Sequence, residues 1–356
     1  MKCSVVPSPV LLSILSLFLL RIAPDSLAAP LVQIGQNFIG STSGVDSDAV
    51  PADTEGAAGP RYFVELINGR FSVYEKSTAT RVQTKTDLQF WQDAGVTFGA
   101  NIDVTDPRIL FDIDSQRWFA SMVDFNGNSL HLRGNRFLVA VSASADPTGA
   151  WSGFAFQADP INLDFADFPT LGIDAEAVYL SGDMFDRQGN EVGPNFIVIP
   201  KSALVVPTPS IASRMSPGIY NVITRGEVLQ PAVTTGAASS PEFMLSVNDV
   251  TTPVQATPSL VASTFLNPNL TNATLANQVH ISVPACNAPA DPSQPDGSNN
   301  LDVGLDARIS GSHCEQRRGL RHLASLQFDR LLPPVRSTNP VMSSTVTLGK
   351  SRVEDP

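Results

Sequence analysis

Short apolar segments recur along the chain, and each is followed by a turn and by a second segment in which apolar and polar residues alternate. The first such unit runs through 59–67, turns at Asn68-Gly69 and returns through 70–75. An Asn-Gly pair between two alternating runs is a strong hairpin signal, and period-two alternation of β-branched and aromatic residues predicts strands. Four more units start in the same way, at 106–112 with 117–124, 167–174 with 177–182, 229–233 with 242–247, and 305–310.

The spacing of these units predicts an all-β propeller. Unit starts recur roughly every 45–75 residues, which is the scale of propeller blades with their loops. Outer strands are expected at 136–142, 151–156 and 195–199, and a short helical turn at 200–204. The alternative is a string of β-sandwiches, which needs about seven strands and a separate core in each domain. No window combines a helical apolar period with capping signals at both ends, so we expect no convincing helix.

The first residues have the features of a secretory signal. Lys2 precedes an apolar run at 10–20, and Ser26 and Ala28 are small residues at the positions a signal peptidase reads, which predicts cleavage after Ala28. An uncleaved membrane anchor is the alternative, although the run is shorter than a spanning helix needs. We therefore expect a signal peptide at 1–28, a poorly ordered leader at 29–55, blades at 56–310 and an atypical or truncated final blade at 311–356.

Charge and cysteine content narrow the expected partners and compartment. The net charge of −11 argues against a nucleic-acid partner, because phosphate binding needs a basic surface. We expect a secreted or periplasmic protein that meets an extracellular glycan or protein and has no membrane span once the signal is removed. Export permits disulfides, so Cys286 and Cys314 are candidates for one; the alternative is two unpaired thiols.

Several motifs in combination resemble a family of large bacterial secreted β-propeller proteins, most of them uncharacterised. They are Gly59–Gly69, Asp106–Asp112 with Arg117-Trp118-Phe119, Ala143–Trp151 and Phe168–Asp174. The resemblance covers about residues 50–310 and implies an extracellular propeller more firmly than any activity. The stretch after Ile309 departs from the family, which we interpret as a truncated or frameshifted end, so that the ring of blades is incomplete.

Residues 144–151 also resemble the Asp-box of sialidase-type propellers, a turn between the third and fourth strands of a blade. Gly149 sits one place later than in the usual pattern. The resemblance implies that Asp146 caps the turn and that Trp151 wedges between neighbouring sheets. These roles are structural, since Asp-boxes lie away from the catalytic face.

Candidate chemistry is sparse. A sialidase-type site needs arginines for a substrate carboxylate, and Arg61, Arg108 and Arg308 each lie near the opening strand of a unit. Their alternative role is to pair with nearby acids. No cofactor is expected and no metal site is assigned: the aspartate-rich loops at 103–106, 112–114, 124–128 and 183–186 could hold Ca²⁺, but turn-forming Asp and Asn explain them without a metal, and we favour that explanation.

Three functions therefore stay open. The one we favour is an extracellular binding or adhesion-type scaffold with no specific reaction, the alternative is a sialidase-like glycoside hydrolase, and the third is a fragment without independent function. Convergence of Arg61, Arg108 and an acid in one axial pocket would favour the hydrolase. A flat, uncharged axial face would favour binding.

Overall fold

Antiparallel sheets make up almost all of the regular structure in this computed structural model. The structure describes residues 36–127, 134–236, 242–247, 259–266, 274–282, 309–317 and 320–328. The chain divides into two units, residues 1–37 and 38–356, and every strand belongs to the second. The predicted signal peptide and its cleavage site lie outside the described residues, and no described helix is long and apolar enough to cross a membrane.

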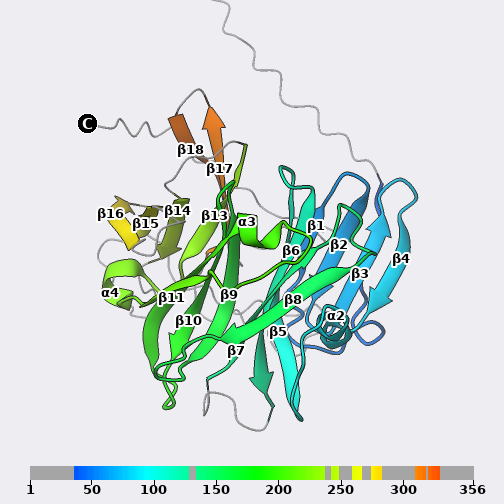
Figure 1. Ribbon diagram of the computed structural model, residues 1–356, viewed down its shortest axis with the longest axis horizontal. Helices are drawn as coiled ribbons and strands as arrows, with labels where there is room; N and C mark the ends of the chain where they lie inside the picture. Colours follow the sequence, from blue (N-terminus) through cyan, green and yellow to red (C-terminus); the bar gives the residue numbers. More distant parts are fainter. Residues whose placement is uncertain are drawn as a thin grey trace, which may run out of the picture. The chain divides into compact units, whose positions relative to one another are not determined.

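Strands succeed one another in antiparallel meanders of four, each called a sheet here, and pairing between first strands joins the last three of them into one ten-stranded sheet (Figure 1). Of the fifth sheet, the described residues comprise two strands. The first sheet consists of β1 (Glu55–Ala58), β2 (Tyr62–Ile67), β3 (Arg70–Glu75) and β4 (Thr80–Lys85), and the second of β5 (Ile102–Asp112), β6 (Arg117–Asn126), β7 (Arg136–Ser142) and β8 (Trp151–Gln157). The third consists of β9 (Phe165–Ile173), β10 (Ala177–Phe185), β11 (Glu191–Pro200) and β12 (Met215–Ile219), and the fourth of β13 (Gln230–Thr235), β14 (Glu242–Val247), β15 (Ser259–Leu266) and β16 (Thr274–Ser282). The last two strands are β17 (Ile309–Arg317) and β18 (Leu320–Phe328).

The first strands of successive sheets lie side by side, and those of the last three sheets pair in parallel. Val233 of β13 pairs with Ile173 of β9, and β13 pairs in parallel with β17 from Ala232–Ser312 to Thr235–Glu315. β1 also contacts β5, and β5 contacts β9. Inner strands that share one centre, with each meander running outward from it, define a propeller, so the predicted fold class is confirmed. The alternative of separate β-sandwiches is wrong.

Each middle sheet is apolar on both faces, which explains why the sheets stack radially. Along β6, Trp118 and Met122 pack into the core shared with the first sheet, whereas Phe119 and Val123 pack into the core shared with the third. Tyr179 of β10 likewise faces a third core, formed with the fourth sheet. Because side chains alternate across a strand, a sheet of this kind needs a neighbour on either side.

Asp146 and Gly149 form hydrogen bonds within the turn between β7 and β8. Asp146 Oδ1 accepts a hydrogen bond from the Thr148 amide (3.0 Å), and the Gly149 amide donates to the Asp146 carbonyl (3.3 Å). The Trp151 ring meets the edges of Phe71 in β3 and of Phe90 (centroid distances 6.1 and 5.1 Å). Trp151 therefore joins the second sheet to the first, while membership of the Asp-box family stays a prediction.

The beginning of the propeller differs from the expectation in two ways. The inner strand of the first sheet is β1 at Glu55–Ala58, whereas the 59–67 segment supplies the second strand. Residues of the expected leader are ordered from residue 38 onward: the Asn68 amide donates to the Ala52 carbonyl and the Ser41 hydroxyl to Glu65 (2.9 and 2.6 Å).

Helices are short but present, so the expectation of none was wrong. Helix α2 (Asp87–Asp93) begins at Thr86, whose hydroxyl accepts a hydrogen bond from the Gln89 amide, and it buries Phe90 and Trp91. Seven residues are too few to display two full helical repeats, so the pattern was not recognised. The predicted turn after β11 is α3 (Lys201–Leu204), and α4 (Val222–Arg225) precedes β13.

Glycine at position 172 allows the close contact between β9 and β13, and its replacement should loosen the propeller. A Cβ there would lie 2.4 Å from Pro231 Cβ and 2.8 Å from the Ala232 carbonyl oxygen. Because backbone cannot move aside cheaply, we expect Gly172→Ala to lower the free energy of unfolding by about 1–3 kcal/mol. Urea unfolding measures this. Gly99→Ala is the control, because its Cβ would meet only Ile102 at 3.9 Å; equal midpoints for the two variants would contradict the prediction.

Candidate functional site

A pair of carboxyl groups lies near the start of the first two inner strands. Asp53 precedes β1, and Asp106 occupies the register shift of β5, where the ladder to β6 is interrupted. The charge of Asp106 acts on the Asp53 carboxyl group. Asn68, the turn residue of the β2–β3 hairpin, joins them: its Nδ2 donates to Asp53 Oδ2 (2.8 Å), and its Oδ1 accepts from the Asp106 amide (2.9 Å). Both aspartates are partly exposed to solvent.

The two aspartates have different hydrogen-bond partners and surroundings. Asp106 accepts hydrogen bonds from the Thr105 hydroxyl (2.9 Å) and from the Phe168 amide (3.0 Å). Burial, and then the neighbouring charge of Asp106, raise the pKa of Asp53 to about 6. Asp53 therefore carries a proton below about pH 6.

Three side-chain-bearing residues around this pair adopt a left-handed backbone. The φ angles are 40° at Asp53, 58° at Asp106 and 47° at Phe168. Such conformations are uncommon outside glycine and cost of order 1–3 kcal/mol each, and they persist only where surrounding contacts hold them. The hydrogen bonds through Asn68 and the Phe168 amide supply that support.

The arginines singled out in the sequence have separate partners. Arg108 lies on β5, is buried, and pairs with Glu55 of β1 at 2.7 Å while its guanidinium covers the Phe168 ring at 4.8 Å. Arg61 lies in the turn between β1 and β2, where it pairs with Glu75 and leaves 67% of its side chain exposed. The two do not form a joint carboxylate clamp, and Arg308 lies outside the described residues.

A groove adjoins the carboxyl pair. Its volume is about 700 Å³, and Asn68 and Thr105, which both hydrogen-bond the pair, form part of its wall. Phe125 contributes a half-buried aromatic ring, and Asp48 and Asp103 are exposed on the wall. The remaining lining comes from 45–51, the start of α2 and the β2–β3 turn: Val45, Asp46, Ser47, Ala49, Val50, Pro51, Gly69, Arg70, Thr86, Asp87, Leu88 and Val104.

Asp87 gives the groove a second carboxyl group that titrates near neutrality. It is buried at the first position of α2, and its Oδ2 accepts the Gly69 amide at 2.6 Å. Burial raises the pKa of Asp87 to about 6, against the lowering effect of its backbone hydrogen bonds. The Asn68-Gly69 turn is thus held between two carboxyl groups, those of Asp53 and Asp87.

Within the part of the chain that the structure describes, no three carboxylate, histidine or cysteine side chains cluster as a metal site. The aspartate-rich loops have turn roles: Asp112 accepts from the Ser115 amide and Asp186 from the Asn190 amide. Of the candidate disulfide, Cys286 lies outside the described residues and Cys314 belongs to β17, of which only the backbone is described.

Comparison with known proteins leaves the chain without a family. No protein-family model matches it, and no curated protein matches its sequence. Among solved structures it is similar to an exo-β-1,3-galactanase from Clostridium thermocellum (10% identity, TM-score 0.38, covering 78% of this chain and 53% of that one). It is also similar to an exo-1,5-α-L-arabinanase from a bovine ruminal metagenomic library (11%, TM-score 0.35, covering 78% and 86%) and to a thermostable family-43 glycoside hydrolase (12%, TM-score 0.37, covering 81% and 95%).

The chain spans about half the length of the first structures that it matches. The strand pairing of this chain by itself defines the propeller fold.

Proposed function

We propose that this chain is an extracellular β-propeller that binds a neutral saccharide in the groove beside the Asp53–Asp106 pair. The observation that carries the proposal is the lining of the groove. It combines one half-buried aromatic ring, Phe125, with hydroxyl, amide and carboxylate groups at a volume suited to a few sugar units. Aromatic faces pack on the apolar faces of sugar rings, and the polar groups can exchange hydrogen bonds with sugar hydroxyls.

The charge of the groove favours neutral over acidic sugars. Four aspartates line it, and its one arginine, Arg70, already donates to the Asp46 carbonyl (2.7 Å). A sialic or uronic acid would bring its carboxylate against these carboxylates without a free arginine to receive it. The separate partners of Arg61 and Arg108 are a further reason to prefer neutral ligands over the sialidase-type substrate.

The test is a glycan array followed by calorimetric titration of the neutral saccharides that bind. We expect Phe125→Ala and Asp103→Asn to weaken binding about tenfold or more, because each removes a direct contact. Asp93→Asn is the matched control: it is an exposed aspartate on α2 that pairs with Lys85 and does not line the groove. Selection of acidic glycans, or affinity unchanged in both groove variants, would overturn the proposal.

A second candidate function is hydrolysis of the bound glycoside, and the pKa of Asp53 is what favours it. A carboxyl group with a pKa of about 6, beside a groove of this size, can donate a proton to a leaving-group oxygen near neutral pH. Asp106 is too close to Asp53 to be the opposing carboxylate, since glycosidases separate that pair by about 5–10 Å. The exposed Asp103 of the groove wall is our candidate for the opposing role.

A further inference from the structure

A second cavity lies at the other ends of the inner strands. Its volume is about 350 Å³, and it is lined by Asp114, Ala175 and Gly236, which follow the ends of β5, β9 and β13. The groove described above instead borders the beginning of β5, at Asp103–Thr105. Because the inner strands run parallel, the two recesses belong to opposite faces of the propeller.

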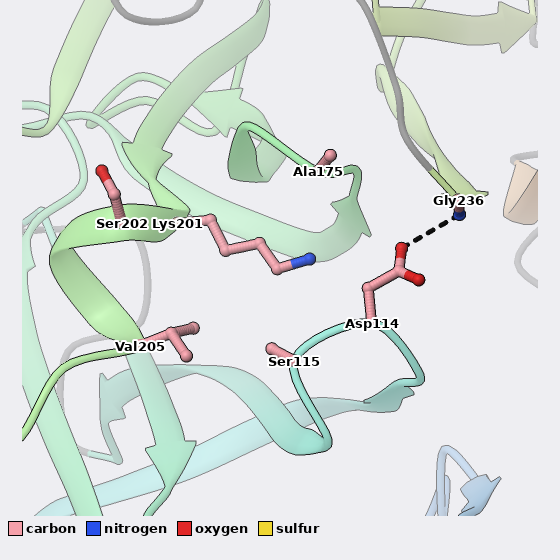
Figure 2. Close-up of a pocket in the computed structure, with 7 residues that line it drawn as sticks. All are labelled: Asp114, Ser115, Ala175, Lys201, Ser202, Val205 and Gly236. Atoms are coloured by element: carbon pink, nitrogen blue, oxygen red, sulfur yellow. Dashed lines mark hydrogen bonds between the residues drawn. The ribbon is translucent and has the colours of Figure 1, made fainter.

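A buried lysine points into this cavity. Figure 2 shows the Lys201 side chain reaching from the start of α3 into the cavity. This side chain is only 8% exposed, and its ammonium lies 2.6 Å from Asp112 Oδ2 and 3.0 Å from the Asp174 carbonyl. An ammonium carries three N–H donors, and these partners accept two of them. The third remains for an acceptor inside the cavity.

Opposite Lys201 lies the carboxylate of Asp114, which accepts a backbone hydrogen bond and forms no ion pair with a described residue. Asp114 Oδ2 accepts the Gly236 amide at 2.9 Å, and Figure 2 shows the Asp114 side chain facing the Lys201 ammonium across the cavity. The charge of Lys201 is already matched by Asp112, and no cation of the described residues forms an ion pair with Asp114. Ala175 and Val205 supply apolar wall.

We propose that this cavity binds a ligand that carries a primary ammonium group and, beside it, an oxygen acceptor. The ammonium of the ligand contacts Asp114, and the oxygen accepts a hydrogen bond from the third Lys201 N–H. The uncompensated charge of Asp114 selects a cation, whereas Lys201, neutralised by Asp112, selects a carbonyl or hydroxyl oxygen more than an anion. Two sources have this chemistry: the amino end of a peptide and an amino sugar. The apolar wall could take a short side chain such as that of alanine.

Alaninamide and glucosamine are the two probes, titrated calorimetrically into the full chain at concentrations up to about 10 mM. We expect at least one to bind, and the stronger of the two identifies the source. N-Acetylalaninamide and glucose lack the ammonium, so neither should show binding that depends on Asp114; glucose that binds in the groove does not meet this side chain. Asp114→Asn should weaken binding of the amine at least about tenfold while keeping the volume and an acceptor for the Gly236 amide.

Asp186→Asn is the matched control, because Asp186 is likewise an exposed turn aspartate that accepts backbone amides but lies in the β10–β11 turn. It should leave affinity unchanged. Absence of binding by both amines, binding of N-acetylalaninamide as tight as that of alaninamide, or equal affinity of Asp114→Asn and the parent protein for the amines would each overturn the proposal. Saccharide binding in the groove is measured separately, so either proposal can fail alone.

Discussion

Replacing Lys201 with methionine should lower the free energy of unfolding by about 3–5 kcal/mol, because it leaves a buried carboxylate without its cation. Lys201 and Asp112 have 8% and 3% of their side chains exposed, and the pair joins α3 of the third blade to the end of β5 in the second. The remaining donors to Asp112 Oδ2 are the Ser115 amide and hydroxyl, which are neutral. The midpoint of urea unfolding, at an unchanged slope, measures the loss.

Two further variants test whether the loss of stability comes from an unpaired buried charge or only from the loss of one contact. Arg61→Met removes an exposed pair with Glu75 and should leave the midpoint where it is. A double variant, Lys201→Met with Asp112→Leu, removes both charges and should recover much of the stability lost in the single variant. If the double variant were as unstable as Lys201→Met, unpaired charge would not be the cause.

The strands could be predicted because their signals are local. The hairpin at Asn68-Gly69 and the alternation along β6 and β10 are visible within ten residues of sequence, and such signals locate the strands and the turns between them. β1 has no such signal, since Glu-Gly-Ala-Ala lacks large apolar residues and becomes a strand only by pairing with β2. The inner strand of the first blade was therefore assigned to the wrong segment.

The carboxyl pair could not be predicted, because it depends on contacts between distant parts of the chain. Asp53 lies in a segment expected to lack order, and Asp106 was considered only as a partner for arginines or as part of the aspartate-rich loop at 103–106. Asn68 was recognised as a turn residue, yet its side chain is what links both aspartates. Residue type and spacing identify Asn68 as a turn former. Its side-chain amide also links Asp53 to Asp106, and this link exists only because the first two blades pack against each other.

Asp53→Asn should reduce hydrolysis of a neutral oligosaccharide about 10²–10⁴-fold, if the groove cleaves what it binds, because an amide cannot donate the proton. Asp53 is protonated below its pKa of about 6, so the rate of the parent protein should fall as the pH rises through 6. An aryl glycoside with a good leaving group needs less help from an acid and should lose much less rate in the variant. Equal losses on the two substrates would indicate that Asp53 has only a structural role, whereas absence of hydrolysis by the parent protein would leave saccharide binding as the function of the groove.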